Sequence, residues 1–187
     1  MILIRHAQSE WNALFSKNQV DAGIADPALT DLGRRQAGEL VGQLSGKGLT
    51  AVVASPYRRT LETATILASA LDLPISVNAL IRERCVFSCD IGSHPTGLKN
   101  DWPDVDFGDL QDGWFGTPPE SEAAVMARCS QFCDEHADIL ARDDIAVVSH
   151  WGFIRALTGE EVDNATILHV GPDRLAIAAS MHWRETC

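Results

Sequence analysis

Short, uninterrupted apolar runs recur along the chain and are separated by stretches of other patterning. A run of four to six apolar residues is long enough for a buried β-strand and too short for most helices. Because both faces of such a strand are apolar, these runs are typical of a parallel sheet covered on both sides. The sequence predicts strands over residues 1–5, 51–54, 75–77 and 144–149, and a last strand over 174–179.

Helical spacing of apolar residues appears between these runs. After Thr30, a favourable N-cap, the apolar residues Ala37, Leu40, Val41 and Leu44 fall on one helical face, and Gly46 follows. The same spacing predicts a helix that starts at Ser55-Pro56 and ends before Pro74, and further helices over 121–142 and 152–157. Strands and helices therefore alternate, which predicts an α/β fold: a three-layer α-β-α sandwich around a mostly parallel sheet.

Two stretches show no clear period. Residues 6–28 are polar and are predicted to be irregular. Residues 85–119 are rich in Gly, Pro, Asp and Trp, and a loop of this length is uncommon unless it has a function. We expect one domain over 1–187 in which 85–119 forms a cap or rim segment. Its aromatic residues are expected to pack on the body of the domain or to line the site: Trp102, Phe107, Trp114 and Phe115.

Charge and composition narrow the choice of partners. The formal net charge of −11 disfavours binding to nucleic acid or to anionic membranes. No apolar run is long enough to span a membrane, and the first residues do not resemble a signal peptide, so we expect a cytoplasmic protein. Segment 85–119 holds six Asp and one Lys. One interpretation is a solvated acidic loop, and the other is a loop that disfavours the binding of strongly anionic substrates.

The five cysteines do not have the spacing of a metal or disulfide framework. Cys85 and Cys89 are four residues apart, as are Cys129 and Cys133. This spacing differs from that of common zinc sites. Cys129 and Cys133 lie on the apolar face of a predicted helix, so we expect them to act as small buried side chains.

Histidine and arginine occur where predicted strands end. His6 and Arg5 end the first strand, His150 follows the strand over 144–149, and Arg58 and Arg59 come soon after the strand over 51–54. Ligands of open α/β sheets bind at the carboxyl ends of the strands. Arginine binds phosphate through two parallel N–H groups, and a neutral imidazole can attack phosphorus. The pattern therefore favours phosphoryl transfer.

Four short motifs carry a resemblance to a known family. They are Arg-His-Ala-Gln-Ser-Glu-Trp-Asn at 5–12; Leu29-Thr30 with Gly33, Gln36 and Ala37; Ser55-Pro56 with Arg59, Thr63 and Ala64; and Ser149-His150 with Gly152. In this order they resemble the motifs of the histidine phosphatase superfamily, the phosphoglycerate-mutase-like proteins. The resemblance covers most of the chain and implies the phosphoglycerate-mutase-like fold.

The resemblance implies a role for each matching residue. His6 would be the nucleophile and form a phosphohistidine, while Arg5, Arg59 and His150 would hold the phosphoryl group. Glu83 sits where the family has its proton donor. Asn12 would help to hold the phosphate, although it could equally cap or turn the chain. The family needs no metal and no organic cofactor.

Competing residues and departures from the family pattern remain. Arg58 is the alternative to Arg59, and Glu62 is the alternative carboxylate to Glu83; both alternatives are more typical of a helix surface. Ala7 stands where the family often has glycine, which is a mild change. Trp151 also replaces a usual glycine, and its ring could narrow the pocket or stack on a substrate.

The combined pattern predicts an enzyme, a phosphatase that hydrolyses a small-molecule phosphomonoester through phosphohistidine on His6. One alternative is a phosphoglycerate-type phosphomutase, although the stretch from Glu83 to His150 is short for that group. Another alternative is an inactive module that binds phosphorylated ligands. The sequence leaves the substrate and the oligomeric state open.

Overall fold

A single five-stranded sheet forms the centre of the computed structural model, which describes residues 1–171 and 175. Its spatial order is β3-β2-β4-β1-β5. Neighbouring strands are parallel except at one edge, where β5 runs antiparallel to β1. The strands are β1 (Ile2–Arg5), β2 (Ala51–Ala54), β3 (Ile75–Val77), β4 (Ile145–Ser149) and β5 (Ile167–His169).

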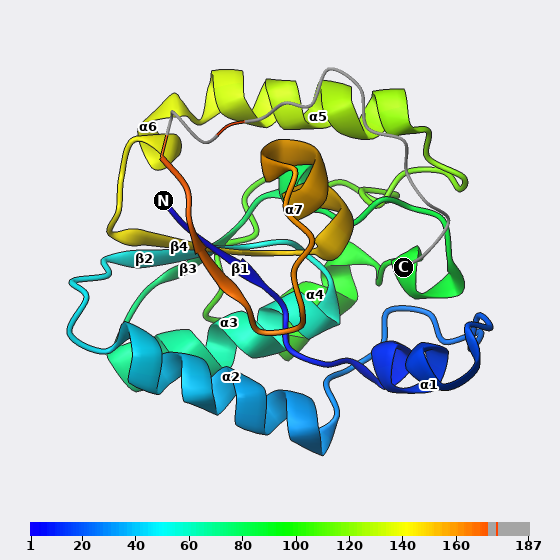
Figure 1. Ribbon diagram of the computed structural model, residues 1–187, viewed down its shortest axis with the longest axis horizontal. Coiled ribbons are helices and arrows are strands. Elements are labelled where there is room, and N and C mark those ends of the chain that lie inside the picture. The colour runs from blue at the N-terminus through cyan, green and yellow to red at the C-terminus, as the bar shows by residue number, and fades with distance from the viewer. Residues whose placement is uncertain (172–174, 176–187) are drawn as a thin grey trace.

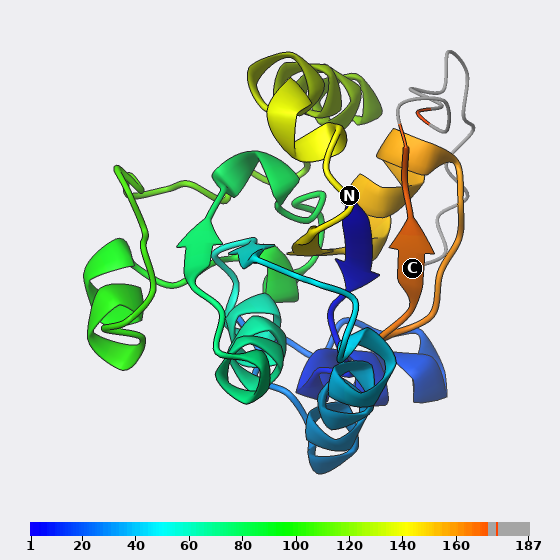
Figure 2. The same ribbon diagram turned by 90° about the vertical axis from the view of Figure 1, so that its left-hand side faces the viewer.

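Helices cover both faces of this sheet (Figures 1 and 2). Helices α2 and α3 lie on one face and α5, α6 and α7 on the other, which confirms the predicted three-layer sandwich. The helices are α1 (Glu10–Asn18), α2 (Asp31–Leu44), α3 (Arg58–Leu71), α4 (Pro95–Asp101), α5 (Glu122–Glu135), α6 (Ala137–Leu140) and α7 (Trp151–Thr158); two short 3₁₀ turns are η1 (Ala79–Ile81) and η2 (Ser88–Asp90).

Alternation along the strands divides the core into two halves. Leu3 and Val147 pack with residues of α5 and α7, whereas Ile4 and Val148 pack with residues of α2 and α3. Successive side chains of a strand point to opposite faces, so a continuously apolar strand supplies both cores. This two-sided burial is the physical reason why the predicted strands lack a polar face.

The sequence analysis missed α1, α4 and β5; α4 lies within segment 85–119, where the sequence shows no clear period. Residues 6–28 were predicted to be irregular, but they contain α1, which begins with a capping box between Ser9 and Asn12. Only Trp11 and Phe15 of this helix are buried, so its apolar pattern is too short to recognise. Strand β5 was also missed, because a partly exposed edge strand of three residues has no clear pattern. The strand predicted over 174–179 lies outside the described residues.

Two predicted helices differ in detail from the observed ones. Helix α3 begins at Arg58 and not at Ser55-Pro56, because Tyr57 has an extended backbone (φ −68°, ψ 145°) and is the N-cap of the helix. The helix predicted over 121–142 is divided into α5 and α6 at His136. Of the two cysteines on its face, Cys129 is fully buried and Cys133 only partly buried.

Segment 85–119 packs on the body of the domain through its aromatic side chains. Phe107 and Trp114 are buried, and the Trp114 ring meets Tyr57 edge-on at 4.6 Å between centroids. The segment is not uniformly solvated, because Asp90 is 2% exposed. Its role as a cap stays a prediction. Within the described part of the chain, no helix has both the length and the apolar character to cross a membrane.

Candidate active site

The sheet order brings the two motif histidines together. Strands β1, β4 and β2 are neighbours, and Arg5 pairs in register with Ser149. His6 and His150 directly follow these two paired residues, and their ring centroids are 5.1 Å apart at an interplanar angle of 60°. The predicted convergence of strand ends is therefore confirmed for β1 and β4, and β2 on the other side of β4 leads into the turn before Arg59.

His6 is buried with a defined tautomer. Its side chain is 3% exposed, and Nδ1 lies 2.7 Å from the carbonyl oxygen of Ala7. Because a carbonyl only accepts hydrogen bonds, Nδ1 carries the proton and Nε2 carries the lone pair. Burial first, and then the positive charges of Arg59 and Arg5, hold the pKa of His6 well below its usual value. The ring is thus a neutral base with its lone pair on Nε2.

His150 stands beside it in a similar environment. The ring is fully buried, and Nε2 lies 2.8 Å from the Ser55 hydroxyl oxygen. Its Nδ1 has no hydrogen-bond partner among the residues that the structure describes. Burial, followed by the charge of Arg59, lowers the pKa of His150 well below its usual value. The Ser55 hydroxyl can donate to Nε2, which leaves the ring proton on Nδ1.

Arg59 lies in the interior, as the motif spacing indicates. It is 3% exposed and its guanidinium group stacks on the ring of Tyr57 at 4.2 Å. It donates to the carbonyl of Cys89 at 2.8 Å and to Asp90 Oδ1 at 3.3 Å. Sequence reasoning missed Asp90, because nothing local distinguishes it from the other aspartates of segment 85–119.

Arg5 and Glu83 complete the predicted set. Arg5 is partly buried and donates to the carbonyl of Val162 at 2.6 Å. Glu83 Oε1 accepts from the backbone N–H groups of Arg84 and Gly152, each at 2.8 Å. Burial first, and then the charge of Asp90, raise the pKa of Glu83 to about 7. A carboxyl group with this pKa can hold and release a proton near neutral pH.

Gly152 explains part of the last motif. A Cβ atom at this position would clash with Glu83 Oε1. Only glycine therefore allows the backbone N–H of residue 152 to approach the carboxylate so closely. The motif that carries His150 also positions the carboxyl group of Glu83.

The two middle motifs fix the turn after His6. The carbonyl of Gln8 accepts from the Thr30 N–H at 3.0 Å, and the Gln8 N–H donates to Gln36 Oε1 at 2.9 Å. The Ala7 N–H donates to the Thr63 hydroxyl oxygen at 3.1 Å. A side chain at Gly33 would clash with the carbonyl of Gln8. These residues of α2 and α3 thus hold the backbone that carries His6.

The structure gives Asn12 a capping contact. Asn12 Oδ1 accepts from the Ser9 N–H at 3.1 Å and from the Asn164 side chain at 3.3 Å. This is the capping alternative expected for Asn12, and a phosphate contact stays a prediction.

Trp151 is the first residue of α7 and is partly exposed. The Arg155 guanidinium lies 4.9 Å from its ring centroid, so one face of this ring has a cationic neighbour. Stacking on a substrate stays a prediction.

The two competing residues lie elsewhere. Glu62 accepts from the Leu29 N–H at 3.1 Å and pairs with Arg34 at 2.9 Å, so it fixes the turn before α2. Arg58 is only partly buried, at the first position of α3. Glu62 is thus engaged at the start of α2, and Arg58 is less deeply buried than Arg59.

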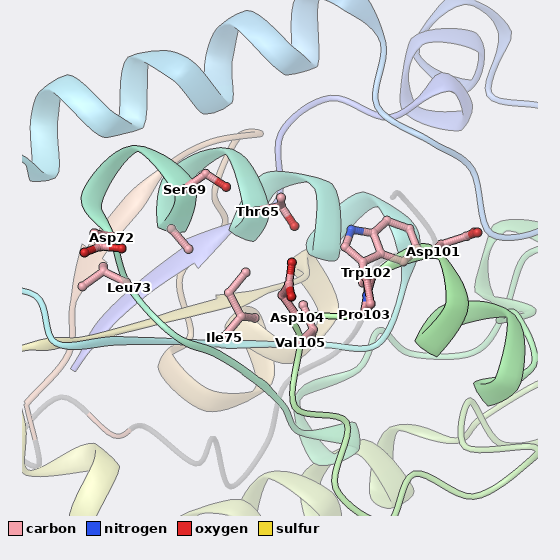
Figure 3. A pocket seen from close by; sticks show the side chains of 11 residues that line it. Thr65, Ser69, Asp72, Leu73, Ile75, Asp101, Trp102, Pro103, Asp104 and Val105 are labelled. Carbon is pink, nitrogen blue, oxygen red and sulfur yellow. The ribbon is translucent and has the colours of Figure 1, made fainter.

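A hollow of about 330 Å³ lies apart from these groups (Figure 3). It runs along the second half of α3 and the start of β3, toward the amino ends of the parallel strands, whereas His6 and His150 follow the carboxyl ends. Asp72 and Trp102 lie at opposite ends of the hollow (Figure 3). Since no residue of the predicted catalytic set lines it, the hollow is not the candidate active site.

Comparison with known proteins assigns the family. Residues 1–175 match the histidine phosphatase superfamily, branch 1. The chain belongs to this superfamily. It is 31% identical over 164 residues to phosphoserine phosphatase 1 of Hydrogenobacter thermophilus, covering 84% of this chain and 73% of that protein. It is 29% identical over 185 residues to glucosyl-3-phosphoglycerate phosphatase of Mycolicibacterium vanbaalenii, covering 90% and 78%.

A solved structure confirms the predicted fold of this superfamily member. The native structure of a mycobacterial glucosyl-3-phosphoglycerate phosphatase superposes with a TM-score of 0.58 at 22% identity, covering 89% of this chain and 87% of that one. At this identity the likeness concerns the fold. The phosphoglycerate-mutase-like architecture expected from the motifs is therefore confirmed.

Proposed function

We propose that this member of the histidine phosphatase superfamily is a phosphatase that hydrolyses a small phosphomonoester through a phosphohistidine on His6. The observation that carries the proposal is the state of His6. Its ring is buried and neutral with the lone pair on Nε2, it lies beside the His150 ring, and the charges of Arg5 and Arg59 act on it. A nucleophile of this kind needs no general base, because its lone pair is already available.

In the first step, His6 Nε2 attacks phosphorus and the bond from phosphorus to the leaving oxygen breaks. The leaving oxygen takes the proton of the Glu83 carboxyl group. Arg5, Arg59 and the Nδ1–H of His150 stabilise the negative charge on the remaining phosphoryl oxygens. The Asn12 side chain is an additional candidate contact for these oxygens.

In the second step, water attacks the phosphohistidine. The Glu83 carboxylate takes a proton from this water, the bond from nitrogen to phosphorus breaks, and inorganic phosphate leaves with His6 regenerated. The pKa of about 7 suits Glu83 for both directions of proton transfer.

The substrate belongs to the class of small phosphate esters. The two relatives above are named for the hydrolysis of phosphoserine and of glucosyl-3-phosphoglycerate. Because their substrates differ, they suggest the class and not one compound. A cytoplasmic location is part of the same proposal.

A phosphatase panel tests the proposal. Wild type, His6→Ala and the control His94→Ala, which changes an exposed histidine, are incubated with p-nitrophenyl phosphate, phosphoserine and phosphoglycerates. Wild type and His94→Ala should release inorganic phosphate, whereas His6→Ala should lose at least about a thousandfold in kcat. Quenching at alkaline pH should trap an acid-labile phosphoenzyme in wild type and in His94→Ala, but not in His6→Ala.

The other outcomes separate the alternatives. An isomerised product without free phosphate would identify a mutase. Bound phosphate without any turnover by wild type would identify a binding module. Hydrolysis that survives in His6→Ala would contradict the role of His6 itself.

A further inference from the structure

Asp90 is a buried carboxylate beside the inner arginine of the site. Its two oxygens have different partners. Oδ2 accepts from the N–H groups of Val86 at 3.1 Å and Phe87 at 3.0 Å, so it folds the loop before η2. Oδ1 accepts from Arg59 Nη2 at 3.3 Å and from the Cys89 thiol at 3.4 Å. Oδ2 therefore binds the loop backbone, and Oδ1 faces the guanidinium group.

The contacts of Arg59 come from the same short segment. Its Nη1 donates to the carbonyl of Cys89, its Nη2 donates to Asp90, and its plane lies on Tyr57. The Tyr57 hydroxyl in turn donates to the carbonyl of Asp90 at 2.8 Å. Among the described residues, these contacts use two N–H groups of the guanidinium, so its remaining N–H groups would be available to an anion.

We propose that Asp90 is a positioning residue of the active site, whose Oδ1 orients the Arg59 guanidinium toward the transferred phosphoryl group. The inference rests on the phosphatase function proposed above. It assigns a role in the reaction to a residue of segment 85–119, and it ties that segment to the phosphate-binding arginine.

The charge of Asp90 has a second consequence, at Glu83. After burial, Asp90 is the main cause that raises the pKa of Glu83, while Arg59 and Arg5 lower it. The charged or titratable residues that interact with Glu83 are Arg5, Arg59, Arg84, Cys89, Asp90 and Arg128. Neutralising Asp90 should therefore lower the pKa of Glu83, and the proton donor should be lost at a lower pH.

A purely structural role for Asp90 is the competing interpretation, and Asp21 provides the matched control. Asp21 holds the same loop from its other side, since it accepts from the Ser88 N–H at 2.9 Å and from the Ser88 hydroxyl. Its contacts do not include Arg59 or Glu83. Asp21→Asn should therefore loosen the loop without changing the charge beside the guanidinium.

Kinetics against pH separate the two interpretations. With an alkyl phosphate, which needs a protonated leaving group, the descending limb of kcat/KM should move to lower pH by about one pH unit in Asp90→Asn. The descending limb of the pH profile of kcat/KM for Asp21→Asn should coincide with that of wild type. In a double-mutant cycle, kcat/KM of the double variant Arg59→Lys with Asp90→Asn should be little lower than kcat/KM of Arg59→Lys alone. An unmoved limb together with additive losses would overturn the proposal.

Two further measurements strengthen the test. One does not depend on turnover, and the other uses a second variant of Asp90. The Glu83 carboxyl carbon is titrated by NMR, with Glu83→Gln used for assignment, and its pKa should fall in Asp90→Asn. Asp90→Ser, whose hydroxyl group can still accept from the loop N–H groups, is a second uncharged variant. If wild type hydrolyses no ester, the phosphatase proposal fails, whereas an unchanged Glu83 titration together with additive losses in the double-mutant cycle would refute the role of Asp90.

Discussion

At the scale of single residues, the protonation of Glu83 is the property on which both activity and stability should depend. Its carboxyl group has a pKa near 7 in the folded protein against 4.5 for an ordinary glutamate. Between these two values the folded chain holds a proton that the unfolded chain has lost. The free energy of unfolding therefore falls as pH rises through this window.

Glu83→Gln should reverse this loss of stability. Below about pH 4.5 the variant and wild type should melt at similar temperatures, because both side chains are neutral in both states. Above pH 7 the variant should melt at a higher temperature, while kcat for alkyl phosphates falls by about a hundredfold or more. Calorimetry across pH 4–9 measures the first effect, and an equal difference in melting temperature at every pH would contradict it.

Gly152→Ala should damage catalysis with little loss of fold. The added Cβ atom would clash with Glu83 Oε1 and displace the proton donor. We expect kcat to fall by about a hundredfold while circular dichroism stays that of wild type. Gly38→Ala is the control, because a Cβ atom there meets nothing within 4 Å. It should gain about 0.5–1 kcal/mol in stability and keep full activity.

At the scale of elements, α2 serves as a support for the turn that carries His6. Thr30 caps the helix by accepting from the Gly33 N–H at 3.0 Å, and its hydroxyl also contacts the Gln8 side chain at 2.9 Å. Thr30 thus joins the start of a helix to the backbone that follows His6. Ser121 provides a comparison, because it caps α5 by accepting from the Ala124 N–H at 3.2 Å.

Thr30→Ala and Ser121→Ala should separate these two tasks. Each removes an N-cap, of α2 and of α5, and should destabilise the protein by about 1 kcal/mol. Only Thr30→Ala should also lower kcat/KM, because it loosens the Gln8 backbone next to His6. The comparison needs one denaturation curve and one measurement of kcat/KM for each variant. Equal kcat/KM values for Thr30→Ala and Ser121→Ala would show that α2 does not support the site.

At the scale of the whole molecule, a buried ionic network joins α5 to the segment that carries Glu83. Glu120 pairs with Arg128 at 3.0 Å and with Arg82 at 2.9 Å. Arg128 also donates to the carbonyls of Leu80 and Arg82 at 2.7 and 2.9 Å. This network links the outer layer of the sandwich to the active site.

Glu120→Gln should lower both stability and activity. It leaves two guanidinium groups in the interior without their carboxylate, which costs about 3 kcal/mol and roughly 6–12 °C in Tm for a protein of this size. Arg142→Ala removes an exposed partner of Asp144 and should melt close to wild type. Thermal denaturation compares the two; a similar small shift in both would mean that the buried network contributes little.

The sequence by itself determined most of the elements and predicted a set of catalytic residues. Apolar runs identified β1, β2, β3 and β4, and helical spacing identified α2, α3, α5 and α7, because periodicity records which positions are buried within one element. The motifs placed His6, His150 and Arg59 at the ends of strands or just after them. These features are local, so they can be read along the chain.

Tertiary structure alone decided which distant groups meet. The strand order put His6 beside His150, and only the fold showed that Gly152 must be glycine to reach Glu83. Asp90 could not be distinguished in sequence from its acidic neighbours, because its burial depends on Arg59, which lies thirty-one positions away. A buried charge is defined by its partners, and those partners come together only when the chain folds.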